Sequence, residues 1–350
     1  MKRNETSVIN VGGVLVGGNN PVAVQSMCNT KTQDVDATLR QISAMAAAGC
    51  DIVRLAVPNM DAARAISAIK ERSPLPLVAD IHFDYKLALE AAERGIDKIR
   101  INPGNIGADS NVKAVADICR KKNIPIRIGV NAGSLDPKLL EKYGHPTAEA
   151  LVESARNEIA LLNRYDFNDV CLSLKTSNVP LTIETYRLAA EEFSCPLHVG
   201  VTETGTVKNG TILSAVGIGT LLCEGIGNTI RVSLTGDPVQ EVTTGISILK
   251  ASGLREGGIR FISCPTCGRT EINLIGLAEE VEGRLADLDK DITVAVMGCV
   301  VNGPGEAREA DYGIAGGKDC GLLFKKGEIV RRVPEDQLCD ALIDMIMKDE

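Results

Sequence analysis

Short aliphatic runs alternate with longer amphipathic segments along most of the chain. The aliphatic runs number eight, at residues 22–27, 51–57, 75–81, 98–102, 124–131, 169–175, 197–202 and 229–234. Between them, segments such as 111–122 and 147–164 place apolar residues at helical spacing. Eight successive strand–helix units are typical of an α/β protein built as a (β/α)8 TIM barrel. A doubly wound sheet is the structural alternative, but it rarely needs eight repeats.

The pattern changes after a glycine pair at 257–258, which marks a predicted domain boundary. We expect a strand at 259–263, a helix at 270–284, a strand at 292–298, a glycine-rich loop at 299–319, a hairpin at 321–333 and a final helix from Pro334. These elements predict a small α+β domain. The domains are therefore expected at 1–256 and 257–350, and an initial hairpin at 8–20 is expected to plug the N-terminal mouth of the barrel.

Composition narrows the class of protein. Acidic residues outnumber basic ones, 46 against 38, and this net charge of -8 disfavours a general nucleic-acid binder. The N-terminus lacks an apolar signal core, and the longest apolar run is too short to cross a bilayer. We therefore expect a soluble, cytoplasmic protein that binds neither membrane nor nucleic acid. In that reducing compartment, the eleven cysteines are not expected to form a disulfide framework.

Five of the eight predicted strands carry a cation where a barrel is normally filled by aliphatic side chains. These cations are Arg54, Arg100, Arg127, Lys175 and Arg231. An unpaired cation in a core costs several kcal/mol, so each needs a buried carboxylate or an anionic ligand. Asp80 and Glu203 are the main carboxylates available, which leaves internal salt bridges as the weaker alternative. The excess of cations over carboxylates predicts a polyanionic substrate, most simply a diphosphate, because guanidinium groups bind phosphate with two parallel hydrogen bonds.

Neutral and titratable side chains near the same strand ends complete this predicted site. Asn131 and Ser233 would add neutral donors. His82 follows the third strand beside Asp80, where a proton donor would be useful.

Three of the thiols in the predicted second domain lie in two motifs. Cys264 and Cys267 have C-x-x-C spacing, and Cys299 follows an apolar strand. The fourth ligand is either Cys320, which would make an all-thiolate site, or Glu306, across a Gly-Pro-Gly turn. Three thiolates with a carboxylate suit a [4Fe-4S] cluster with one weakly held iron. A four-cysteine zinc site is the alternative.

The motifs "ADIHFDYKLA", "KIRINPGNIG", "IRIGVNAGSLD", "LHVGVTETG", "FISCPTCGRT" and "VMGCVVNGPGEAREADYGIAGG" resemble those of the 4-hydroxy-3-methylbut-2-en-1-yl diphosphate synthase family. The similarity runs nearly end to end. It implies a barrel followed by a domain related to sulfite and nitrite reductase modules, in a homodimer. It also implies an iron–sulfur oxidoreductase of the non-mevalonate isoprenoid pathway, with ferredoxin or flavodoxin as electron donor. The implied reaction is reductive ring opening of 2-C-methyl-D-erythritol 2,4-cyclodiphosphate.

The resemblance also assigns roles to individual residues. It makes Cys264, Cys267, Cys299 and Glu306 the cluster ligands, with Glu306 a displaceable one. It assigns diphosphate binding to Arg54, Arg100, Arg127, Asn131, Lys175, Arg231 and Ser233. It places Asp80, His82 and Glu203 near the substrate hydroxyls. The rival hypothesis is a sugar-phosphate lyase barrel that carries a zinc-stapled interaction domain.

Overall fold

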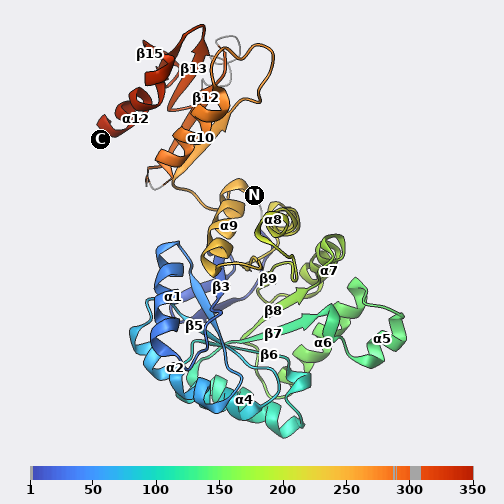
Figure 1. The fold of residues 1–350 in the computed structure, drawn as a ribbon. Coiled ribbons are helices and arrows are strands. Elements are labelled where there is room, and N and C mark those ends of the chain that lie inside the picture. The colour runs from blue at the N-terminus through green and yellow to red at the C-terminus, as the bar shows by residue number, and fades with distance from the viewer. Residues whose placement is uncertain (1–2, 287, 289, 300–308, 350) are drawn as a thin grey trace. The chain divides into compact units, whose positions relative to one another are not determined.

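The computed structural model describes residues 3–286, 288, 290–299 and 309–349. Within it the chain forms two compact units, Met1–Arg255 and Glu256–Glu350 (Figure 1). Each unit has a hydrophobic core of its own, so each is described by itself.

The first unit is a parallel eight-stranded barrel surrounded by helices, which confirms the predicted fold (Figure 1). Its strands are β3 (Ala23–Met27), β4 (Ile52–Ala56), β5 (Leu77–Asp80), β6 (Lys98–Ile101), β7 (Ile126–Asn131), β8 (Val170–Lys175), β9 (His198–Val199) and β10 (Thr229–Ile230). The hydrogen-bonded order is β8-β7-β6-β5-β4-β3-β10-β9. All eight predicted runs therefore become strands, although β9 and β10 have only two residues each.

The outer helices are α1 (Val35–Ala47), α2 (Met60–Arg72), α3 (Tyr85–Glu93), α4 (Asp109–Lys122), α5 (Pro137–Tyr143), α6 (Ala148–Asn163), α7 (Val179–Glu192), α8 (Val207–Cys223) and α9 (Pro238–Ala251). Several begin at a residue whose side chain accepts a hydrogen bond from a free amide of the first turn. Asp34, Asn59, Thr147 and Asn178 act in this way. The helices bury aliphatic faces on the strands, and so the strands' outward residues form the main core.

The barrel closes where β8 meets β9. Leu172 and Leu197 form an isolated parallel bridge there. The buried hydroxyl of Tyr186 on α7 donates to the carbonyl of His198 at 2.6 Å and accepts from the amide of Leu174 at 3.0 Å. One side chain thus joins two strands that share few backbone hydrogen bonds.

The predicted hairpin consists of β1 (Val8–Val11) and β2 (Val14–Gly17), which pair antiparallel. Its buried Ile9, Val11 and Val16 pack with residues at the N-terminal ends of barrel strands, among them Ile52 and Cys171. The hairpin therefore seals the N-terminal mouth with apolar side chains.

The second unit is a five-stranded mixed sheet with two helices. The strands β11 (Ile259–Ser263), β12 (Ile292–Met297), β13 (Tyr312–Gly317), β14 (Cys320–Lys325) and β15 (Glu328–Pro334) pair in chain order. The helices α10 (Leu274–Leu285) and α12 (Leu338–Lys348) pack on the sheet through a core that includes Val281 and Leu342.

Three predictions for the second unit need correction. The first helix begins at Leu274 rather than at Thr270, because the side chain of Asn273 caps it by accepting from the amide of Gly276. The last helix begins at Leu338, after a short 3-10 turn. Strand β13 was expected to be a glycine-rich loop, but it pairs with both β12 and β14.

Among the described residues, no helix combines the length and the apolar composition that crossing a bilayer requires.

Candidate functional site

The five predicted cations lie inside the barrel. Alternate residues of a strand face the same side, and the outward residues beside these cations belong to the aliphatic core. Arg127 and Lys175 are buried, with exposed fractions of 3% and 5%. The side chains of Arg54 and Arg100 are 11% and 10% exposed, and that of Arg231 is 19% exposed.

Asp80 at the end of β5 holds two of these cations. Its Oδ1 accepts from Nη1 of Arg100 at 3.1 Å, and its Oδ2 lies 3.7 Å from Nε of Arg54. Burial raises the pKa of this carboxyl, but the positive charges of Arg54 and Arg100 outweigh it, so the net pKa lies below 3.8. Asp80 is therefore an anion that positions two guanidinium groups.

A second buried carboxylate, Glu241 of α9, was missed in the sequence. It accepts from Nη2 of Arg231 at 3.0 Å, from Oγ of Ser26 at 2.8 Å and from the amide of Leu234 at 3.0 Å. The sequence offered one signal, since a helix after the last strand must pack on the barrel. Periodicity alone could not show that its glutamate points inward.

A sixth interior cation, Lys98 at the start of β6, was also missed. It lies two residues before Arg100 and therefore on the same face of the strand, a signal that the alternation did contain. Among the described residues, these six cations share two interior carboxylates, Asp80 and Glu241, which leaves an excess of four positive charges when all six cations are protonated.

Much of this charge has no protein partner. Among the described residues, buried atoms without a hydrogen bond include Nε and Nη1 of Arg127, Nε of Arg100, Nε of Arg231 and Nζ of Lys98. Burial lowers the pKa of Arg127 to about 10, and the neighbouring Arg100 lowers it further. Burial also lowers the pKa of Lys175 well below 10.5, with Arg127 as the next cause. Donors without partners among like charges favour an anionic ligand.

Two glycines make room for these side chains. A Cβ atom on Gly129 would lie 2.8 Å from Nε of Arg100. A Cβ atom on Gly200 would lie 2.6 Å from Nζ of Lys175 and 2.4 Å from the carbonyl oxygen of Arg231. The long cations can therefore extend across the barrel only because these positions lack side chains.

The remaining predicted residues sit around the C-terminal ends of the strands. His82 is half exposed, and its ring nitrogens lie 3.1 and 3.2 Å from Nη1 of Arg100. With Asp80 and Phe83 it lines a cavity of about 330 Å³. Asn131 ends β7 in register with Lys175.

Two predicted residues follow the short strands β9 and β10. Glu203 is exposed and has a φ of 58°, a left-handed conformation that costs a non-glycine residue energy and is enriched at functional sites. Ser233 has a buried hydroxyl without a hydrogen bond among the described residues. The barrel thus brings the predicted cations and Asp80 together, while Glu203 stands at the rim.

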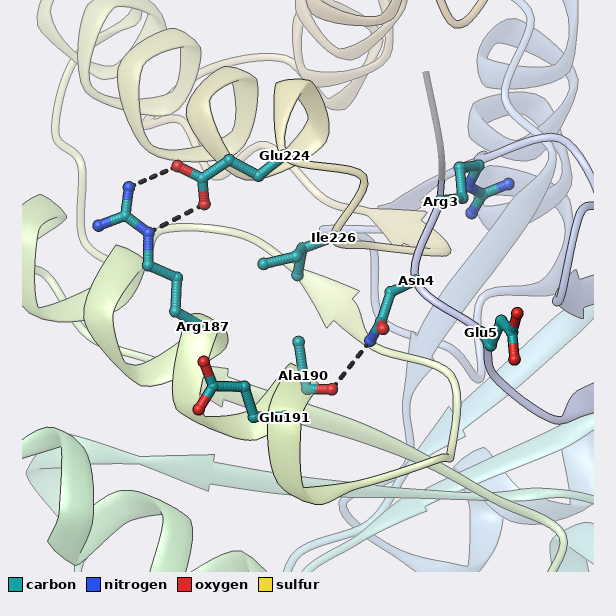
Figure 2. A pocket seen from close by; sticks show the side chains of 8 residues that line it. All are labelled: Arg3, Asn4, Glu5, Arg187, Ala190, Glu191, Glu224 and Ile226. Atoms are coloured by element: carbon teal, nitrogen blue, oxygen red, sulfur yellow. Dashed lines mark hydrogen bonds and ion pairs between the residues drawn. The ribbon is translucent and has the colours of Figure 1, made fainter.

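A separate cavity of about 600 Å³ lies outside this site (Figure 2). It is lined by the N-terminal segment, by α7 and by the turn before β10. An ion pair between Arg187 and Glu224 and a hydrogen bond from Asn4 to the carbonyl of Ala190 occupy its walls. None of the predicted site residues lines it.

Two of the predicted thiol ligands follow neighbouring strands of the second unit's sheet. β11 and β12 are parallel neighbours, so Cys264 and Cys299 follow strand ends at the same edge. The Sγ atom of Cys264 accepts from the amide of Gly298 at 3.2 Å. Cys267 is exposed and Cys299 is buried. Glu306 lies outside the described residues.

The alternative ligand Cys320 begins β14, and its Sγ accepts from Nε of Arg332 at 2.9 Å. In the part of the chain that the structure describes, no three His, Cys, Asp or Glu side chains are arranged to hold a metal ion. The donor chemistry nevertheless fits a thiolate-bound group. Soft sulfur ligands follow adjacent strands, and one of them already accepts an amide hydrogen bond of the kind that tunes metal-bound thiolates.

Comparison with solved structures finds a likeness of fold at low sequence identity. A dihydropteroate synthase from Yersinia pestis matches 70% of this chain and 97% of its own, with a TM-score of 0.50 and 15% identity. An N-acetylneuraminic acid synthetase from Leptospira borgpetersenii matches 82% of this chain and 99% of its own, with a TM-score of 0.51 and 15% identity. At this identity the likeness shows a shared fold and no more.

Comparison with sequences covers both units. The GcpE TIM-barrel domain model matches residues 6–246, and the GcpE protein C-terminal domain model matches residues 260–348. A Geobacter sulfurreducens protein named 4-hydroxy-3-methylbut-2-en-1-yl diphosphate synthase (flavodoxin) is 62% identical over 98% of each chain. One of the same name from Clostridium perfringens is 60% identical over 99% of each chain. The resemblance read from the motifs is confirmed, and the chain belongs to the GcpE family of 4-hydroxy-3-methylbut-2-en-1-yl diphosphate synthases.

Proposed function

We propose that the chain catalyses the reductive ring opening of 2-C-methyl-D-erythritol 2,4-cyclodiphosphate to 4-hydroxy-3-methylbut-2-enyl diphosphate. The observation that carries this proposal is the excess of four positive charges inside the barrel. A doubly phosphorylated sugar alcohol supplies the negative charge that the protein lacks there. The names of the near full-length relatives agree with this substrate class.

In this proposal the barrel binds the diphosphate through Arg54, Arg100, Arg127, Lys175 and Arg231, with Asn131 and Ser233 as neutral donors. Asp80 and Glu241 hold Arg100 and Arg231 in fixed orientations before the substrate arrives. Such prior ordering reduces the side-chain entropy lost on binding. Arg127 has two buried nitrogens that make no hydrogen bond to any described residue, so it gains most from phosphate oxygens.

The resident cofactor in this proposal is a [4Fe-4S] cluster. Cys264, Cys267, Cys299 and Glu306 would hold it. When bound, such a cluster supplies electrons one at a time. Glu306, as an oxygen ligand among sulfurs, would be the ligand most easily displaced.

Proton transfer falls to residues at the barrel mouth. The cyclic substrate, two electrons and one proton give the linear diphosphate and water. Because Arg54 and Arg100 keep Asp80 ionised, this carboxylate is a poor proton donor and serves better as an acceptor for a substrate hydroxyl. His82 is about half exposed and Glu203 is exposed, so both can exchange protons with solvent and we assign them the donor role.

The proposed partners are a flavodoxin and a second copy of the chain. The relatives' names specify flavodoxin as the donor, which favours it over a ferredoxin. Helix α8 is apolar on both sides and exposes Ile212, Leu213 and Val216, which supports a homodimer that covers it. Val216→Glu should shift the protein toward monomer in analytical ultracentrifugation. The many thiols suit the reducing cytoplasm.

The test is anaerobic turnover. Purified protein with a strong one-electron reductant should convert the cyclodiphosphate to the linear product, and metal analysis should find about four irons per chain. Glu306→Ala should retain most of the iron and lose most of the turnover. A colourless protein with one zinc and no turnover would instead support the zinc-stapled rival.

A further inference from the structure

Lys98 is a fully buried cation that has no hydrogen-bond partner in the part of the chain that the structure describes. It begins β6 and is 0% exposed. Among the described residues, its Nζ atom has no hydrogen bond. A lysine in this position is unusual, because an ammonium group loses its hydration on burial and normally recovers the energy from a carboxylate.

The charged and titratable groups around Lys98 offer no such carboxylate. The groups that act on its charge from other strands are Cys171, Arg127 and Arg54, and Lys98 and Lys175 both act on His198. Asp80 is in contact with Arg54 and Arg100. The apolar hairpin seals the barrel below, so solvent does not replace the missing partner there.

The surroundings of Lys98 lower the pKa of its ammonium group. Burial lowers the pKa of Lys98 to about 8; the Cys171 thiol opposes this shift, and Arg127 and Arg54 add to it. His198, whose ring nitrogens also have no hydrogen bond among the described residues, is kept neutral by burial and by the same cations. Without a ligand, Lys98 therefore changes charge near physiological pH.

The proposed substrate changes this balance. Each phosphate of the cyclodiphosphate carries one negative charge and has no group that titrates near neutrality. When the cyclodiphosphate binds beside Arg100 and Arg127, its two negative charges offset half of the excess of four positive charges. The field at Lys98 then favours the ammonium form. Ring opening adds a further negative charge, because it turns a phosphodiester into a terminal phosphate.

We propose that Lys98 is a positioning residue of the diphosphate site that takes up a proton when the ligand binds, and so matches the charge of the barrel to that of its ligand. This inference rests on the proposed function for the identity of the ligand. Lys98 acts through Arg100 and Arg127 rather than by contact with the ligand, because it lies one layer of interior side chains below these two arginines.

The sign of the pH dependence follows from linkage. A group whose pKa is higher in the bound state strengthens binding below its free-state pKa and stops doing so as the pH rises through its bound-state pKa. The dissociation constant of the substrate should therefore rise about tenfold for each pH unit above pH 8, until the bound-state pKa is reached. Lys175 is a second buried amine, so it contributes a parallel dependence that does not require Lys98.

The experiment is isothermal titration calorimetry of full-length, anaerobically reconstituted protein without reductant, so that no turnover occurs. Cyclodiphosphate is titrated at pH 8 in buffers of different ionisation enthalpy, which gives the number of protons taken up. Lys98→Met keeps the length and the apolar stem of the side chain. Lys121→Met, an exposed lysine on α4, is the matched control.

Wild type and Lys121→Met should take up protons on binding. Lys98→Met should take up fewer, should bind several-fold more weakly at pH 7 and should show a flatter pH profile. Lys98→Met should also raise the melting temperature of the ligand-free protein, because it removes an unpaired buried charge. Equal proton uptake in wild type and Lys98→Met, or a lower melting temperature for Lys98→Met, would overturn the inference.

Failure of the proposed function gives a different pattern. Inorganic pyrophosphate is titrated in parallel, and its own ionisation cancels in the difference between wild type and Lys98→Met. Binding of pyrophosphate alone, with a difference in proton uptake, would reject the cyclodiphosphate and keep the role of Lys98. Absence of binding by either ligand would reject both.

Discussion

Replacing Glu241 with alanine should destabilise the barrel unit more than most single substitutions do. Glu241 is 4% exposed and is the partner of Arg231, whose Nη2 lies 3.0 and 3.2 Å from its two carboxylate oxygens. The variant would leave a cation, the hydroxyl of Ser26 and the amide of Leu234 without their acceptor. It would also add one positive charge to an interior that already has an excess.

The expected magnitude follows from these contacts. Removing one partner of a buried ion pair costs about 3–5 kcal/mol. The two neutral donors add to this, though not in full, because water can enter the space left by the side chain. For a unit of this size, one kcal/mol lowers the melting temperature by roughly 2–4 °C, so we expect a fall of roughly 6–20 °C.

Thermal unfolding followed by far-ultraviolet circular dichroism suits the measurement, because the chain has no tryptophan. Glu241→Gln should fall between wild type and Glu241→Ala, since the amide oxygen still accepts a hydrogen bond but carries no charge. Gln240→Ala, at the exposed neighbouring position, is the control. A melting temperature for Glu241→Ala within about 2 °C of the control would refute the argument that this carboxylate offsets barrel charge.

Three other predictions concern single contacts. Glu158 on α6 is buried, which raises its pKa to about 7, so the wild type loses stability as the pH rises from 4.5 to 7. In urea unfolding, the stability of Glu158→Gln relative to wild type should therefore increase over this pH range and stay constant above it. Gly129→Ala should displace Arg100, weakening cyclodiphosphate binding by at least tenfold in calorimetry while Gly133→Ala, in open space, leaves it unchanged. Tyr186→Phe should lower barrel stability by about 1–3 kcal/mol in chemical denaturation, because the amide of Leu174 and the carbonyl of His198 lose their shared hydroxyl.

The fold was predictable because its signals are local. Each barrel strand is a short aliphatic run, and each outer helix has helical spacing of apolar residues, so the order of elements could be read without tertiary information. Strand β13 was missed for the opposite reason. Its sequence, YGIAGG, has glycines where strands usually carry branched side chains, and it is a strand because both neighbours pair with it.

The candidate site divides in the same way. The cations on the strands could be placed in the barrel because period-2 alternation fixes which face a residue occupies. Glu241 could not, since it comes from a helix that packs over the barrel, and only the tertiary structure brings it to Arg231 and Ser26. The thiol motifs placed Cys264 and Cys299 after predicted strands, and only the structure shows that these strands are parallel neighbours.

The placement of opposite charges explains why a barrel with so many interior cations can still fold. Asp80 and Glu241 come from different parts of the chain, and each holds a guanidinium group near the C-terminal mouth. The N-terminal mouth is filled by Ile9, Val11 and Val16 of the hairpin, so the apolar core that stabilises the unit lies below and around the charged layer. Positive charge is therefore concentrated at the end of the barrel where TIM-barrel enzymes bind their ligands. Repulsion among these cations lowers the stability of the ligand-free protein, and a bound anion removes that repulsion. The same cations therefore weaken the ligand-free fold and select a diphosphate.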